Sequence, residues 1–166
     1  MSSPAKTIAA YIGLGSNLGD ATHYVQRALE QLNRLPNTQL ERHSSLFRTA
    51  PIDAQGDDFI NAVALLRTSL TAQELLHALQ IIENDFGRER PYVNAPRTLD
   101  LDILLYGDQC INSADLLVPH PRLTQRAFAL IPLLQIDPFI AIPSVGPAHS
   151  FVMNVSGQKI NKIESP

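Results

Sequence analysis

The sequence predicts an α+β protein in which helices pack against a β-sheet. The chain has 166 residues, of which 45% are apolar, which is enough for one hydrophobic core. Strand-like runs and helical patterns follow one another without the regular alternation of a βαβ protein. We therefore expect a single domain over residues 1–166.

The first half of the chain predicts a strand, a helix and further strands. Residues 7–15 are rich in strand-forming residues. Residues 20–35 predict a helix, because Asp20 can cap it and apolar residues recur at helical spacing. Further strands are expected over 39–50 and 59–70, with a loop over 51–58.

The clearest helix is predicted over residues 71–87. Thr71 and Glu74 have the spacing of a capping box, and Gly87 is a typical C-terminal stop. A basic loop should follow over 88–96 and a strand over 97–107, and a turn follows at Gly107-Asp108. We also expect a short strand near 110–111 and a helix from about Thr124; the last 30 or so residues give no clear pattern.

Composition excludes several classes of protein. A formal charge of −3 gives no basis for nucleic-acid binding through bulk charge. The single cysteine, Cys110, excludes an internal disulfide and a cysteine-rich zinc site, and it fits a reducing cytoplasm. No run approaches the roughly 18 apolar residues that span a membrane, and the N-terminus resembles a first strand rather than a signal peptide.

Two aspartates in the predicted strand 97–107 raise the question of function. Side chains alternate along a strand, so Leu99, Leu101 and Ile103 should face the core. Asp100 and Asp102 then share the opposite face, where two close carboxylates repel each other unless a cation or water separates them. Magnesium binds one or two carboxylates and completes its shell with water and phosphate oxygens. A metal site and a pair of solvated aspartates are both open from this pattern.

Arginines surround the acidic pair in the sequence. Five of the thirteen basic residues lie between positions 88 and 126, namely Arg88, Arg90, Arg97, Arg122 and Arg126. Arginine suits phosphate oxygens, and carboxylates beside arginines are the groups that phosphoryl transfer uses. Surface ion pairs with nearby acids such as Glu83 and Asp85 are the alternative for each arginine.

Three other motifs are weaker. The stretch GLGSNLGD (13–20) lacks the third glycine of a dinucleotide fingerprint, and we interpret it as a glycine-rich turn between strand and helix. Phe59 and Asn61 have strand spacing and could hold a flat heterocycle, although a phenylalanine on a strand is usually core. A lone histidine such as His120 is usually structural.

Four stretches together resemble one family. YIGLGSN, FRTAP…FIN, APRTLDLDILLYG and VPHPRLTQRAFALIPL are similar, in order, to 6-hydroxymethyl-7,8-dihydropterin pyrophosphokinase over about residues 8–138. The resemblance implies a ferredoxin-like α+β fold with an antiparallel sheet. It implies transfer of the β,γ-pyrophosphoryl group of ATP to the pterin hydroxymethyl oxygen in folate biosynthesis, with two Mg²⁺ ions, and we expect a cytoplasmic monomer.

The resemblance also implies roles for individual residues. Asp100 and Asp102 would bind the metal, and Arg88 and Arg97 would be catalytic, serving the phosphates. The ATP site would comprise Gln80, Glu83, Arg88, Arg90, Arg97, His120 and Arg126. The pterin pocket would comprise Thr49, Ala50, Ile52, Phe59, Asn61, Asp102 and Phe128, with the pterin between the two phenylalanine rings.

This chain departs from the family pattern, and two other classes of function stay open. It has VNAPR where many members have RWGPR, so a tryptophan is missing. A metal-dependent nucleotidyltransferase with a D-x-D strand would release pyrophosphate rather than AMP. A non-catalytic ligand-binding domain would use the aromatic pocket and need no metal.

Overall fold

The computed structural model describes residues 6–17, 19–50, 57–87 and 99–163. Its main sheet has six strands. Five of them lie in the order β10-β3-β4-β1-β5, and the sixth, β2, pairs with the part of β4 that β3 leaves free. Every pairing in this sheet is antiparallel. The strands are β1 (Ile8–Ser16), β2 (Thr38–His43), β3 (Phe47–Thr49), β4 (Phe59–Thr68), β5 (Asp100–Tyr106) and β10 (Ile160–Lys162). The predicted α+β class with an antiparallel sheet is confirmed.

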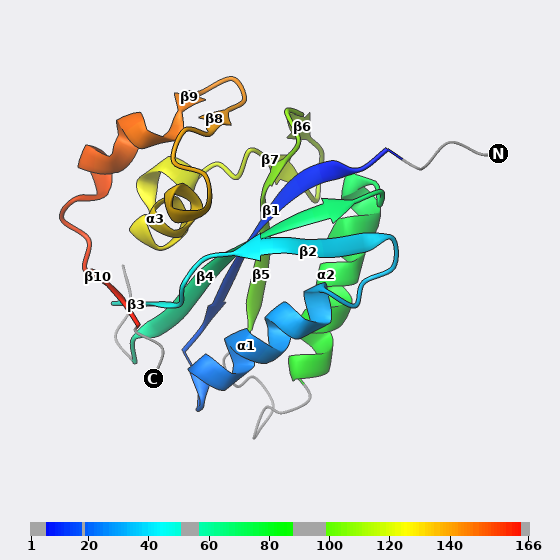
Figure 1. Ribbon diagram of the computed structural model, residues 1–166, viewed down its shortest axis with the longest axis horizontal. Coiled ribbons are helices and arrows are strands. Elements are labelled where there is room, and N and C mark those ends of the chain that lie inside the picture. The colour runs from blue at the N-terminus through cyan, green and yellow to red at the C-terminus, as the bar shows by residue number, and fades with distance from the viewer. Residues whose placement is uncertain (1–5, 18, 51–56, 88–98, 164–166) are drawn as a thin grey trace.

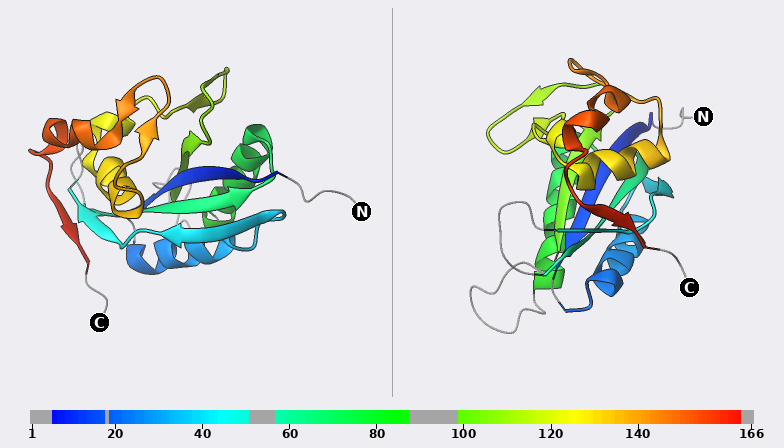
Figure 2. Two further views of the ribbon diagram at one scale, coloured as in Figure 1. Left: turned by 45° about the horizontal axis from the view of Figure 1, so that its top comes forward. Right: turned by 90° about the vertical axis from the view of Figure 1, so that its left-hand side faces the viewer.

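Helices cover both faces of this sheet (Figures 1 and 2). Helices α1 (Ala21–Leu32) and α2 (Ala72–Gly87) lie on one face, and α3 (Ala127–Ile136) lies on the other. The predicted helix starts are confirmed for the first two. Asp20 accepts a hydrogen bond from the His23 amide at 3.2 Å, and Thr71 and Glu74 bond reciprocally at 2.8 and 3.1 Å. No helix in the described ranges is long and apolar enough to cross a bilayer.

The sheet separates two hydrophobic cores. Alternate residues of β1 and β4, among them Ile12 and Leu66, pack with α1 and α2 in the first core. The intervening residues, among them Tyr11 and Leu65, pack with α3 in the second. Since β-strands project successive side chains to opposite faces, the continuous apolar run of β4 reflects a strand that is buried on both sides.

A bulge in β5 changes which face its side chains reach. Tyr11 pairs with Leu105 but the next residue, Ile12, pairs with Ile103, so Leu104 is an extra residue on β5. Leu101 and Ile103 therefore belong to the first core, whereas Leu104 and Leu105 both belong to the second. Side chains at the acidic end of β5 thus alternate regularly between the two faces, whereas its C-terminal end packs against both cores.

Two sequence expectations need correction. The strand expected over 39–50 is interrupted, because both the backbone amide and the hydroxyl of Ser44 bond to Val63, with β2 ending before it and β3 starting after it. The helix expected from Thr124 begins as a 3₁₀ turn, η1 (Leu123–Gln125), before α3. The short strand expected near 110–111 is β6 (Ile111–Asn112), paired with β7 (Leu117–Val118).

The C-terminal region, which the sequence left unassigned, is structured. The hairpin β8 (Ala141–Ile142) and β9 (Gly146–Pro147) follows α3, and a 3₁₀ helix, η2 (Ala148–Val155), packs against it. The chain then returns to the main sheet as β10 beside β3, with Ile160 opposite Thr49 (Figure 1).

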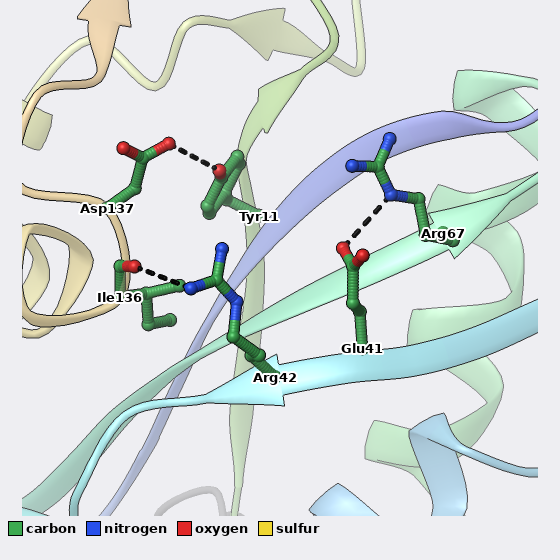
Figure 3. Close-up of polar contacts among 6 residues, drawn as sticks. All are labelled: Tyr11, Glu41, Arg42, Arg67, Ile136 and Asp137. Atoms are coloured by element: carbon green, nitrogen blue, oxygen red, sulfur yellow. Dashed lines mark hydrogen bonds and ion pairs between the residues drawn. The ribbon is translucent and has the colours of Figure 1, made fainter.

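Side chains from the sheet hold the C-terminal end of α3 (Figure 3). The Tyr11 hydroxyl donates to Asp137 at 3.2 Å, and Arg42 Nη1 donates to the Ile136 carbonyl at 3.2 Å. Arg42 therefore satisfies a carbonyl that a helix C-terminus leaves without a partner. Gln135 adds two bonds to Ser45, at 2.7 and 2.9 Å. The end of α3 that is remote from the candidate site is thus tied firmly to β1, β2 and the segment after β2.

Candidate functional site

A cavity of about 280 Å³ lies on the α3 face of the sheet, beside the first turn of that helix. Its walls come from β1, β3, β4, β5 and the start of α3. It is lined by Gly13, Leu14, Gly15, Thr49, Ala50, Phe59, Asn61, Asp100, Asp102, Leu104, Arg126, Phe128 and Ala129. One cavity therefore combines aromatic, amide, acidic and basic groups.

The floor of the cavity is made by two glycines of β1. Gly15 pairs with Asn61 on one side and with Asp100 on the other. Gly13 occupies the corresponding place next to Asp102. Because neither glycine has a side chain, the Asn61 amide can lie over Gly15 and the Leu104 side chain over Gly13. The strand expected over 7–15 is confirmed by β1, which contains both glycines. The glycine-rich turn expected over 13–20 is therefore wrong for these two residues; Gly19, with φ of 51°, is in the turn.

Asn61 is buried and held in a fixed orientation. The Thr49 hydroxyl donates to its Oδ1 at 2.6 Å, and its Nδ2 contacts the Leu14 carbonyl at 3.5 Å, which is long for a hydrogen bond. A buried amide with its carbonyl oxygen satisfied and its NH₂ group weakly bound is suited to bind the polar edge of a ligand.

The two aspartates lie as the strand alternation predicts. Asp100 and Asp102 are exposed, and the three apolar residues that alternate with them are buried, namely Leu99, Leu101 and Ile103. The Leu101 amide, between the two aspartates, donates to Glu83 Oε2 at 2.9 Å. Glu83 of α2 therefore fixes the backbone that presents the acidic pair. Carboxylate oxygens of this kind are the hard ligands that Mg²⁺ and Ca²⁺ prefer.

Two aromatic rings and one arginine complete the walls. Phe59 begins β4 and Phe128 is the second residue of α3, so the two rings come from different layers. The Arg126 guanidinium lies over the Phe128 ring, 5.4 Å from its centroid, a cation–π geometry. Arg126 was assigned to the ATP site by resemblance, and here it lines the same cavity as the expected pterin residues.

A second hollow, of about 320 Å³, lies beside Asp102 and contains His120. His120 Nδ1 accepts a hydrogen bond from the Arg122 amide at 3.2 Å, so any hydrogen on the neutral ring is at Nε2. Burial lowers the pKa of His120; Asp102 opposes this effect, whereas Arg126 and Arg122 reinforce it. Gln80, also expected at the ATP site, is an exposed residue of α2.

The cavity thus brings together most of the predicted pterin residues and the acidic pair. Ile52, Arg88, Arg90 and Arg97 lie outside the described residues. Sequence reasoning missed five lining residues, which are Gly13, Leu14, Gly15, Leu104 and Ala129. Strand alternation could have identified Gly13 and Gly15, because residues 11, 13 and 15 of one strand face the same side of the sheet.

The fold and this cavity define an α+β protein of the small-molecule-binding class, with its binding groups gathered at one end of an antiparallel sheet. The chain belongs to the 7,8-dihydro-6-hydroxymethylpterin-pyrophosphokinase family, whose model matches residues 11–138. The family resemblance predicted from the four sequence stretches is confirmed.

Named relatives support the same family. The chain is 38% identical over 157 residues to the 2-amino-4-hydroxy-6-hydroxymethyldihydropteridine pyrophosphokinase of Haemophilus influenzae, covering 94% of this chain and 98% of that protein. It is 44% identical over 134 residues to the Pseudomonas aeruginosa protein of the same name, covering 80% and 83% of the two chains.

Solved structures share the fold at low identity. The wild-type HPPK-DHPS of Plasmodium falciparum matches with a TM-score of 0.76 and 14% identity, over 99% of this chain and 50% of that one. This chain therefore spans half of that solved protein. At such identity the match supports the fold alone.

Proposed function

We propose that this chain transfers the β,γ-pyrophosphoryl group of ATP to the hydroxymethyl oxygen of 6-hydroxymethyl-7,8-dihydropterin and releases AMP. The observation that supports this most directly is the shared cavity of Phe59, Phe128, Asn61 and the Asp100/Asp102 pair. A flat heterocycle and the acidic pair would then lie within one small volume. Membership of the family and the names of its relatives favour the same reaction.

The pterin would bind between the rings of Phe59 and Phe128. Aromatic rings stack with flat heterocycles, and a stacked pair contributes roughly 0.5–1.5 kcal/mol beyond the area that it buries. The amide of Asn61, oriented by Thr49, would bind the polar edge of the heterocycle. In this arrangement the hydroxymethyl group would point along the cavity toward Asp100 and Asp102.

Asp100 and Asp102 would hold the magnesium that accompanies ATP. They fit Mg²⁺, because both carboxylates are exposed at the same cavity and supply hard oxygen ligands. Among the described residues no group of three or more histidine, cysteine, aspartate or glutamate side chains could hold a metal. ATP phosphate oxygens and water would therefore complete the shell of each of the two ions we expect. Bound Mg²⁺ would neutralise phosphate charge and polarise the P–O bonds.

In the transfer step the hydroxymethyl oxygen attacks the β-phosphorus of ATP. A new O–P bond forms, the bond from the β-phosphorus to the α,β-bridging oxygen breaks, and AMP leaves with that oxygen. The hydroxyl proton passes to solvent. The chain's own contribution is positioning by the pterin walls and charge stabilisation by arginines, for which we propose Arg88 and Arg97 from the sequence.

The test is to incubate the protein with ATP, Mg²⁺ and the reduced pterin and to identify the nucleotide product. AMP together with pterin pyrophosphate supports the proposal. Pyrophosphate release would indicate a nucleotidyltransferase, and pterin binding without any nucleotide product would indicate a non-catalytic ligand-binding domain. Either result contradicts the proposed transfer.

We also propose that the fold is ferredoxin-like, which the order of the strands supports. With the three-residue strand β3 left aside, the first units follow the order β1-α1-β2-β4-α2-β5. The corresponding strands are arranged β2-β4-β1-β5, with both helices on one face. This is the arrangement expected of a β-α-β-β-α-β unit. We further propose that the enzyme is a monomer, the state expected from the sequence.

A further inference from the structure

The C-terminal segment beyond the family match contacts the wall of the candidate site. The match ends at residue 138, yet residues 139–163 continue as an ordered hairpin, a 3₁₀ helix and β10. Ile160 of β10 pairs with Thr49, whose hydroxyl orients Asn61. The Ile163 amide bonds to the Leu46 carbonyl at 2.8 Å and extends this contact.

Gln158, just before β10, binds the start of α3 with both ends of its amide. Its Oε1 accepts from the Ala127 amide at 2.8 Å, and its Nε2 donates to the Gln125 carbonyl at 2.7 Å. The two bonds therefore bracket Arg126, which lines the cavity. Both distances are those of well-formed hydrogen bonds.

This contact replaces the usual helix cap. A helix leaves its first amides without partners, and a serine, threonine or aspartate side chain commonly binds one of them. Arg126 occupies the N-cap position of α3 and makes no side-chain capping bond within the described residues. The amide of Gln158, 31 positions away in the sequence, supplies the acceptor instead.

Phe128 packs on the second core but borders open space on two sides. It lines the candidate cavity of about 280 Å³ and also a third hollow of about 300 Å³. The lining of this third hollow includes Gln158 and Lys159. A ring with open space on two sides is placed mainly by its backbone, and that backbone is the first turn of α3.

We propose that Gln158 is a positioning residue for the heterocycle, which holds the first turn of α3 so that Phe128 and Arg126 keep their places in the cavity wall. This inference rests on the proposed pterin site. It extends the functional part of the chain past residue 138, into a segment that meets the candidate site at Thr49 and at the first turn of α3.

The chain offers a matched pair of variants. Gln135 also makes two amide bonds from α3, to Ser45, but at the C-terminal end of the helix. Gln158→Met and Gln135→Met each remove two hydrogen bonds from a glutamine while keeping a side chain of similar length. We would measure kcat, the KM for the reduced pterin and the KM for ATP, with thermal unfolding of each purified variant.

We expect Gln158→Met to raise the pterin KM about fivefold to tenfold, as the loss of one or two hydrogen bonds would. The ATP KM should rise less, through Arg126, and kcat should stay within about twofold of wild type. Gln135→Met should lower thermal stability by a similar amount but leave the pterin KM unchanged. If Gln158→Met does not fold, Gln158→Glu, which keeps the acceptor for Ala127 and loses the donor, should raise the pterin KM at least about threefold.

The outcomes separate the two proposals. An unchanged pterin KM in an active Gln158 variant would overturn the positioning role and leave the proposed reaction standing. An equal rise for pterin and ATP, or an equal effect of Gln135→Met, would also overturn it, because general loosening of α3 would then explain the data. A wild-type protein that neither binds nor converts the pterin would overturn the proposed function and this inference with it.

Discussion

The side-chain amide of Asn61 occupies the space over Gly15, its partner in the pairing of β1 with β4. A Cβ atom on residue 15 would lie 2.8 Å from Asn61 Nδ2, closer than a methyl group can approach. The orientation of the amide in the cavity therefore depends on a glycine at position 15. A side chain would fit better at position 13 of the same strand, where a Cβ would meet Leu104 at 3.4 Å.

Gly15→Ala should weaken pterin binding about tenfold, because the added methyl group displaces the Asn61 amide from its bond with Thr49. Gly13→Ala, on the same strand and face, should have a smaller effect, since its Cβ would make a near-ordinary contact. Titration calorimetry with 6-hydroxymethylpterin measures both. Equal affinities for the two variants would mean that Asn61 does not bind the ligand edge.

Removing either carboxylate should abolish transfer. Asp100→Ala or Asp102→Ala would lose a hard oxygen ligand and its charge, and the rate of AMP release should fall on the order of a thousandfold or more. Asp108→Ala, in the turn after β5, is the control and should retain activity. Asp102→Ala should unfold at a temperature no lower than wild type, because removing one charge of an exposed like-charge pair relieves repulsion. A variant with most of its turnover would rule out the metal assignment.

Phe59→Ala should weaken binding of the pterin and leave binding of ATP nearly unchanged. Loss of the ring removes stacking and buried area, so pterin affinity should drop about tenfold or more, while binding of a non-hydrolysable ATP analogue stays within about twofold. Phe139→Ala removes the same side chain from a position that is 85% exposed and should change neither. Unchanged pterin affinity in Phe59→Ala would make Phe59 a wall residue without a stacking role.

Local patterns in the sequence were sufficient for much of the fold and for the acidic pair. The capping box at Thr71 and Glu74 and the alternation through Leu99, Leu101 and Ile103 depend only on residues a few positions apart. Such patterns follow directly from helical and strand geometry. The pterin residues were found by resemblance, and the structure gathers the described ones around one cavity.

Features that depend on distant contacts could not be predicted. The break at Ser44 results from its bonds to Val63, and the role of Gln158 results from partners 31 and 33 residues away. Gly13 and Gly15 fell in both the predicted strand 7–15 and the predicted turn 13–20, because glycine favours turns. In the structure a glycine is required at position 15, where an amide from the next strand fills the space. The assignments of Arg88 and Arg97 remain predictions from the sequence.

The last prediction concerns the contact between Tyr11 and Asp137, which ties α3 to the sheet (Figure 3). Burial raises the pKa of Tyr11 to about 12, and the neighbouring Asp137 carboxylate adds to the rise. A raised pKa in the folded state stabilises the protein fully below pH 10, the ordinary tyrosine value. That contribution is lost as the pH rises from 10 toward 12. Tyr106, whose pKa burial also raises, contributes in the same direction.

Tyr11→Phe should therefore lower the free energy of unfolding by about 1.5 kcal/mol at neutral pH, the usual value of a hydrogen bond to a charged group. It should also reduce the loss of stability between pH 10 and 12, leaving the part due to Tyr106. Urea unfolding at both ends of this range measures the two effects. Glu41→Gln, which breaks the exposed ion pair with Arg67 at 3.0 Å in the same region, is the control and should cost less than about 1 kcal/mol. An alkaline profile for Tyr11→Phe identical to that of wild type would show that Tyr11 is not the group that titrates there, and the anchoring of α3 would then rest on Arg42 and Gln135.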